Sequence, residues 1–131
     1  MKKLFTGVIM LCILILLIGC DTKDDSTIKN GTYVMDQEGV EKVLLPRIMI
    51  SEKDIVFIHD LLSSYLPYGT YSINEDILTM TTDDDQYTYI FQIDGDSLIF
   101  QKNESSAIKR VNDAFGTLVA DQSKFVLTEE Q

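Results

Sequence analysis

The sequence contains little of what most catalytic and nucleic-acid-binding sites require. Its 131 residues include one His, two Cys, two Pro and no Trp, and 11 Lys and Arg stand against 21 Asp and Glu, a formal net charge of −10. Nucleic-acid binding needs clustered Lys and Arg that contact phosphate groups, so this excess of acid argues against a nucleic-acid partner. A chain of this length allows a single domain.

Common catalytic motifs are also absent from the sequence. No Ser lies in a Gly-x-Ser-x-Gly turn, and there is no glycine-rich phosphate loop. A Ser-His-Asp arrangement would have to use His59, which lies next to Asp60 at the end of an expected strand. A single His in such a place is more often a structural or surface residue than a catalyst. We therefore expect a protein that is not an enzyme and that uses no cofactor.

Two acidic segments stand out, and the first of them could suggest a metal site on composition alone. Asp83-Asp84-Asp85 offers several carboxylates, which Ca²⁺ favours, but the spacing does not match an EF-hand loop. Three adjacent Asp residues between two expected strands indicate a solvated hairpin tip instead. Asp94-Gly95-Asp96 is explained by turn chemistry, since Gly and Asp tolerate positive φ. We expect no metal site in either segment.

The N-terminus has the pattern of a targeting segment. Met1-Lys2-Lys3 is basic, and an apolar run from Val8 to Ile18 follows. That run is shorter than the about 20 residues that a membrane-spanning helix needs, and it suits the apolar region of a signal peptide. We expect residues 1–19 to be a signal peptide. The alternative is an uncleaved single-span anchor.

The end of this run, Leu17-Ile18-Gly19-Cys20, resembles the lipobox of bacterial lipoproteins. The resemblance implies cleavage between Gly19 and Cys20 and a lipid anchor on Cys20, whose acyl chains (palmitate among them) hold the protein to the membrane. It also implies a place on the outer face of the cytoplasmic membrane, in the cell envelope. The Lys-Lys start and the long apolar run favour a Gram-positive organism, while Asp21 is also compatible with inner-membrane retention in a Gram-negative one.

Cleavage would leave a tether and one β-rich domain. It would remove Cys12, so that Cys20 is the one remaining Cys and no internal disulfide can form. It would also remove two Lys and no acid, leaving 9 basic against 21 acidic residues, a net charge of −12. Residues 20–30 are polar and predict a lipidated Cys followed by a flexible linker. Residues 31–131 form the expected domain.

Short alternating segments separated by turn residues predict an antiparallel all-β domain of about eight strands. Pro46 would occupy an edge or a bulge of its strand. Residues 107–118 are either one short helix or an irregular loop. The expected strands are Gly31–Asp36, Val43–Ile50, Asp54–Asp60, Gly69–Ile73, Ile77–Thr81, Gln86–Ile93, Ser97–Gln101 and Ser123–Thr128.

The meander from Gly69 to Leu98, with its Gly-Thr-Tyr strand and Asp-Gly-Asp turn, resembles small lipocalin-like (calycin-type) domains of bacterial secreted lipoproteins. The resemblance implies a small up-and-down barrel or a strongly bent sheet. It carries no activity, because one fold hosts many functions.

One expected loop is unusually apolar. Residues 61–68 hold five large apolar or aromatic side chains in a segment between two strands, which indicates either a lid over one end of the sheet or an exposed recognition patch. We take these five as candidate ligand-binding or lid residues. They are Leu61, Leu62, Tyr65, Leu66 and Tyr68.

Two classes of function follow from these features. The first is a binding module that takes a small apolar ligand or a peptide. The second is a structural or interaction role, in which the domain docks onto another envelope protein. The charge adds a variant, since an acidic surface favours cationic partners. In size, anchor, β content and charge, though in no shared motif, the chain is similar to small immunity lipoproteins that sequester cationic antimicrobial peptides.

Overall fold

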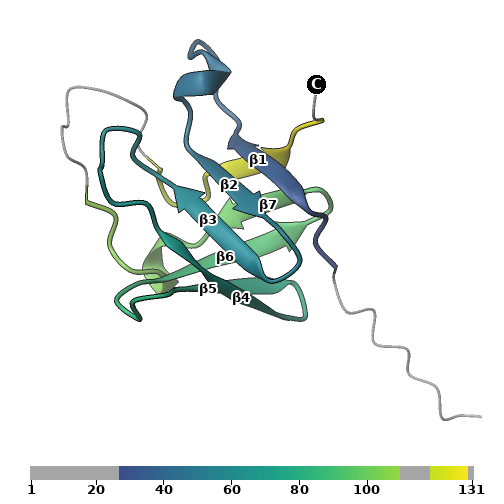
Figure 1. The fold of residues 1–131 in the computed structure, drawn as a ribbon. Coiled ribbons are helices and arrows are strands. Elements are labelled where there is room, and N and C mark those ends of the chain that lie inside the picture. The colour runs from purple at the N-terminus through teal and green to yellow at the C-terminus, as the bar shows by residue number, and fades with distance from the viewer. Residues whose placement is uncertain (1–26, 110–118, 130–131) are drawn as a thin grey trace, which may run out of the picture.

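The computed structural model describes residues 27–109 and 119–129, and in this part of the chain eight strands form a closed antiparallel barrel (Figure 1). Each strand pairs with the next, and β8 pairs with β1. The mainly β, lipocalin-like expectation is confirmed, and the sheet closes into a barrel instead of remaining an open bent sheet. The strands are β1 (Gly31–Met35), β2 (Arg47–Ile50), β3 (Asp54–Ile58), β4 (Tyr68–Asn74), β5 (Ile77–Thr82), β6 (Thr88–Asp94), β7 (Ser97–Phe100) and β8 (Lys124–Leu127).

Alternation of side chains between the two faces explains why these segments are strands. Along β5 and β6 every second residue is buried, as the period-two pattern of the sequence predicts. Leu78 and Met80 of β5 and Phe91 of β6 are fully buried. A slip of one residue would turn these side chains out to solvent, so the burial pattern fixes the register of the barrel.

The strand expected over Val43–Ile50 is wrong in its first half. Residues Lys42–Leu44 form a 3-10 helix, η2, and the strand begins only at Arg47. Pro46 has no N–H to give to a strand partner, although its carbonyl accepts a 3.0 Å hydrogen bond from the Met35 amide. The Arg47 guanidinium donates to the carbonyls of Lys42 and Val43 and holds the turn closed. Pro46 therefore lies just before a strand of a closed barrel, not at a sheet edge.

The segment expected as a helix or loop lies largely outside the described residues. Residues 110–118 are not described, and residues 107–109 are not helical. A second 3-10 helix, η3, spans Lys102–Glu104 after β7. Within residues 27–109 and 119–129, no helix has the length and apolar character needed to cross a membrane.

Aromatic side chains fill the interior of the barrel. Phe57 lies among four other rings, with centroid distances of 5.1 Å to Tyr89, 5.3 Å to Phe91, 6.0 Å to Phe100 and 5.8 Å to Phe125. All five side chains are at most 1% exposed. Burial of each is worth about 1.5–3 kcal/mol before entropy is subtracted, so this cluster contributes substantially to the stability of the fold.

One glycine allows two strands to approach closely. A Cβ atom at Gly69 of β4 would lie 2.1 Å from the carbonyl oxygen of Thr81 on β5. No side chain can occupy that position without moving the backbone. The small residue therefore sets the contact between β4 and β5.

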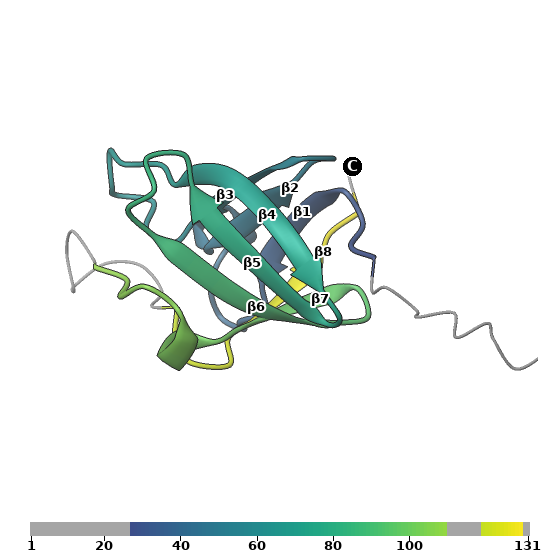
Figure 2. The same ribbon diagram turned by 90° about the horizontal axis from the view of Figure 1, so that it is seen from below.

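The up-and-down order of the strands makes the two ends of the barrel different (Figures 1 and 2). At one end, here called the turn end, lie the short connections at 51–53, 75–76 and 95–96, together with residues 27–30 that lead into β1. At the other, the loop end, lie the connections between β1 and β2, β3 and β4, and β5 and β6. The apolar segment 61–68 thus belongs to the end opposite the point where the chain enters the barrel.

Candidate binding surface

The five candidate ligand-binding or lid residues are exposed at the loop end. Their exposed fractions lie between 41% for Tyr65 and Leu66 and 53% for Leu62 and Tyr68, with Leu61 at 45%. A lid that sealed the barrel would bury these side chains against the aromatic core. The exposure therefore favours the second interpretation of this segment, an exposed apolar patch.

The β3–β4 loop is held by hydrogen bonds, so the exposure does not reflect a lack of local structure. The Asp60 carboxylate accepts a 2.9 Å bond from the Leu62 amide, and the Ser63 hydroxyl accepts a 3.1 Å bond from the Tyr65 amide. The Pro67 carbonyl accepts a 3.0 Å bond from the Phe57 amide in β3. The loop therefore presents its apolar side chains from a fixed backbone.

The acidic turn between β5 and β6 is joined to this loop. The Tyr65 hydroxyl donates a 2.7 Å hydrogen bond to Oδ2 of Asp84, and the Asp83 amide donates a 2.9 Å bond to the Tyr68 carbonyl. Residues 61–68 and 83–85 thus form one continuous surface, which we call the apolar–acidic surface.

Asp84 organises the acidic turn. Its Oδ1 accepts hydrogen bonds from the Thr82 hydroxyl at 2.6 Å and from the Gln86 amide at 3.1 Å. These bonds and the one from Tyr65 favour the charged carboxylate and hold the pKa of Asp84 below its usual value. The turn is exposed, as expected of a hairpin tip. In the described residues no group of three or more His, Cys, Asp and Glu side chains is placed to hold a metal ion.

A row of aromatic rings connects this surface to the core. The Tyr65 ring lies 5.7 Å from that of Tyr87, and Tyr87 stacks on Tyr89 at 6.3 Å. Tyr89 belongs to the core cluster around Phe57, and burial raises its pKa to about 12. The apolar–acidic surface therefore packs, through Tyr65, on a row of rings that leads into the core.

His59 directly follows β3 and lies on the side of the core that faces the loop end. Its ring is 5.3 Å from Phe57 and 5.9 Å from Tyr89. Its Nδ1 atom is buried and has no hydrogen-bond partner within the part of the chain that the structure describes. Burial lowers the pKa of His59, and the neighbouring Asp60 opposes this only in part. The partly buried ring of His59 packs against the edge of the core, which fits the structural role that the sequence predicts as one of two alternatives.

The turn end has a different character, with a polar depression next to the point where the chain enters. Its volume is about 800 Å³, and its walls include Lys29, Met49, Asp96, Leu127 and Glu129. The depression lies outside the aromatic core. The Asp96 of the expected Asp-Gly-Asp turn thus borders it.

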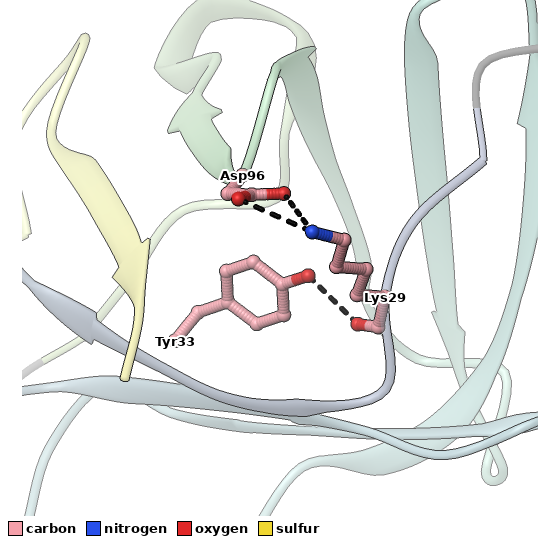
Figure 3. Close-up of polar contacts among 3 residues, drawn as sticks. All are labelled: Lys29, Tyr33 and Asp96. Atoms are coloured by element: carbon pink, nitrogen blue, oxygen red, sulfur yellow. Dashed lines mark hydrogen bonds and ion pairs between the residues drawn. The ribbon is translucent and has the colours of Figure 1, made fainter. Parts of the chain in front are cut away.

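The residues before β1 are fixed to the turn end (Figure 3). Lys29 Nζ lies 3.2 Å from Oδ1 of Asp96, and the hydroxyl of Tyr33 donates a 2.7 Å hydrogen bond to the Lys29 carbonyl. Ile28 packs against the core. The last residues of the expected flexible linker therefore contact the barrel. The expected lipobox, including Gly19 and Cys20, lies outside the described residues.

Sequence reasoning missed two exposed apolar residues at the loop end. Val43 and Leu44 are 65% and 52% exposed in the connection between β1 and β2. They continue the apolar run of β2, and for this reason the sequence pattern predicts a strand that begins at Val43. Pro46 is the signal that could have excluded Val43 and Leu44 from the strand, since β2 begins directly after it at Arg47.

Comparisons of the chain with protein-family models, with curated proteins and with solved structures found no match.

Proposed function

We propose that this protein is a lipid-anchored, extracytoplasmic lipoprotein without catalytic activity, whose barrel binds another protein or peptide through its loop end. The observation that carries the proposal is the exposed apolar–acidic surface on a barrel with a filled interior. Monomeric soluble proteins seldom expose several large apolar side chains in one short segment unless they form a contact site.

The filled interior weighs against the other binding mode, a small apolar ligand inside the barrel. An eight-stranded barrel is just wide enough either to be filled by side chains or to hold one small ligand. Here Phe57 and the four rings around it occupy the centre. A ligand at this place would have to displace rings that are at most 1% exposed.

The position of the surface fits a protein attached by its N-terminus. Residues 27–30 enter at the turn end, and the seven residues from Cys20 to Ser26 reach at most about 25 Å when extended. An anchor on Cys20 would hold the turn end near the lipid and leave the loop end accessible to a partner in the envelope.

Site-specific photo-crosslinking tests the proposal. The full-length chain, expressed in its own host, would carry a photoreactive amino acid at Leu62 or Leu66, and at Met49 as the control. Met49 is also exposed, at 36%, but lies on the wall of the barrel in β2. We expect one discrete adduct from positions 62 and 66 and none from position 49.

The partner identified from that adduct must then bind the purified full-length chain. Leu66→Ser should weaken this binding about tenfold, because central apolar contacts carry most of the affinity of an interface. Equal adducts from all three positions, or unchanged affinity of the Leu66→Ser variant, would contradict the proposal. A co-purifying small molecule detected by native mass spectrometry would support the interior site instead.

A further inference from the structure

We infer that the partner of the apolar–acidic surface is a cationic amphipathic peptide or protein segment, with apolar side chains on the β3–β4 loop and Lys or Arg side chains beside Asp83 and Asp85. This inference rests on the proposed function and names the chemistry of the partner. It comes from the charges that surround the apolar residues.

The local charge at this surface is entirely of one sign. Residues 59–68 and 82–87 contain four Asp and no Lys or Arg. The chain as a whole carries −10, so no distant excess of base compensates for this field. Such a surface attracts cations and repels anions, and it speeds the encounter with a positively charged partner.

The acidic turn is organised in a way that leaves carboxylates for a partner. The Asp84 carboxylate accepts hydrogen bonds from the hydroxyls of Thr82 and Tyr65, and these bonds fix the conformation of the turn. The side chains of Asp83 and Asp85 are exposed and make no hydrogen bond or ion pair within the described residues. Because the turn is already ordered, binding would require little loss of backbone freedom.

The apolar half of the surface lies directly beside these carboxylates. The Tyr68 carbonyl accepts a hydrogen bond from the Asp83 amide, and the Tyr65 hydroxyl donates one to the Asp84 carboxylate. Leu62 and Leu66 belong to the same short loop and are 53% and 41% exposed. A ligand that covers this area must therefore present apolar and positively charged groups side by side, which is the pattern of a basic amphipathic peptide.

The same charges disfavour other occupants. A second copy of the chain would bring one acidic turn against another, and like charges close together oppose association. An anionic lipid surface would also be repelled, although it too could accept the leucines. A cationic amphipathic segment is the class that satisfies both halves of the surface.

The test uses the full-length acylated chain in nanodiscs of phosphatidylcholine, a zwitterionic lipid, and three synthetic peptides. The first alternates Lys and Leu in an amphipathic helical pattern. In the second, Glu replaces every Lys. In the third, Ser replaces every Leu. Binding to empty nanodiscs is subtracted, and the dissociation constant is measured by fluorescence anisotropy at about 10 mM and about 150 mM salt, where the screening length is roughly 30 Å and 8 Å.

We expect the Lys–Leu peptide to bind at low salt and less tightly at high salt, and the other two to bind at least about tenfold more weakly. Asp83→Asn with Asp85→Asn should raise the dissociation constant about threefold to tenfold. Leu62→Ser with Leu66→Ser should raise it about tenfold or more. Asp94→Asn and Met49→Ser, which change an exposed acid and an exposed apolar residue elsewhere on the barrel, should leave it unchanged.

The outcomes separate this inference from the proposed function. If the Glu–Leu peptide binds as well as the Lys–Leu peptide, or the Asp variants have no effect, the cationic partner is wrong while docking at the loop end stands. If neither the Lys–Leu nor the Glu–Leu peptide binds but a crosslinked protein does, the cationic partner is again wrong and docking at the loop end again stands. Self-association that disappears in the Leu62→Ser, Leu66→Ser variant would assign the surface to a second copy of the chain. If that variant alters neither peptide binding nor crosslinking, both proposals fail.

Discussion

The hydroxyl of Tyr65 donates a 2.7 Å hydrogen bond to Oδ2 of Asp84, and this bond joins the exposed apolar loop to the acidic turn at the loop end of the barrel. The two residues are 19 positions apart in the sequence. The bond has two consequences: it orders the turn that carries Asp83 and Asp85, and it raises the pKa of Tyr65 while lowering that of Asp84.

Removing this hydroxyl should loosen the surface without unfolding the barrel. In Tyr65→Phe the ring that packs near Tyr87 is kept, and only the hydrogen bond to Asp84 is lost. Because the pair is exposed to solvent, we expect the free energy of unfolding to remain close to that of the wild type. Hydrogen exchange at the Asp85 and Gln86 amides should become faster.

The carboxyl of Asp84 provides a second measurement on the same variant. The bond from Tyr65 favours its charged form, so its pKa should rise in Tyr65→Phe, which NMR titration of the side-chain carboxyl carbon would detect. Tyr71→Phe serves as the control, since the Tyr71 hydroxyl bonds to the carbonyls of Ser51 and Glu52 near the turn end. An unchanged Asp84 pKa in Tyr65→Phe would show that the bond does not persist in solution.

Gly69 offers a test of the close contact between β4 and β5. In Gly69→Ala the new methyl group would lie 2.1 Å from the Thr81 carbonyl oxygen, so the strands must separate. We expect a loss of about 1–3 kcal/mol or more in the free energy of unfolding, measured by urea denaturation. Gly39→Ala is the comparison, because a Cβ there meets nothing within 4 Å and only its positive φ of 80° opposes the change. That variant should lose about 1 kcal/mol. A smaller loss at Gly69 than at Gly39 would contradict the described contact.

The sequence predicts the strands well where alternation and turn residues agree. From Tyr68 to Phe100 each expected strand lies within two residues of its observed bounds, because Asp94-Gly95-Asp96 and Asn74-Glu75-Asp76 mark the turns clearly. The prediction fails at Val43 and Leu44, where an apolar run continues into η2. Local pattern cannot show that Arg47 will hold the preceding carbonyls in a turn. Closure of the barrel is also beyond local pattern, since it depends on the pairing of β1 with β8.

The candidate site was only partly predictable for a similar reason. The apolar character of residues 61–68 is visible in the sequence, and so is the acidic run at 83–85. That these two segments form one surface is not visible in the sequence, because the Tyr65–Asp84 and Tyr68–Asp83 contacts join segments that are distant along the chain. Whether the interior was filled or hollow could not be read from alternation either, since both kinds of barrel share it.

His59 should make the stability depend on pH in the range where histidine titrates. Its pKa is lowered in the folded state, so the unfolded chain, with a value near 6.5, takes up the proton first as the pH falls. Stability should therefore be full above about pH 7 and should decrease as the pH drops below about 6.5, until the folded-state pKa is reached. Thermal unfolding between about pH 7.5 and about pH 5.5 would show this decrease.

The variant His59→Phe isolates the effect. It keeps a ring against Phe57 and removes both the titrating group and the buried Nδ1 that lacks a partner among the described residues. The melting temperature of this variant should change less over the same pH range, because Asp and Glu titrate mainly below about pH 5. Parallel curves for the two proteins would exclude His59 as the source of the pH dependence.

The proposed lipid anchor can be tested at Cys20, with Cys12 as the matched control. If the lipobox interpretation is correct, Cys20→Ala should abolish incorporation of labelled palmitate and prevent cleavage after Gly19, while Cys12→Ala should retain both. Membrane fractionation alone would not decide the matter, because an uncleaved precursor keeps its apolar run and would sediment with membranes as well. The mass of the N-terminal peptide does decide it, since a processed chain begins at an acylated Cys20 and a single-span anchor begins at Met1. Palmitate found in the Cys20→Ala protein would therefore refute the anchor, and with it the argument that the loop end faces away from the lipid.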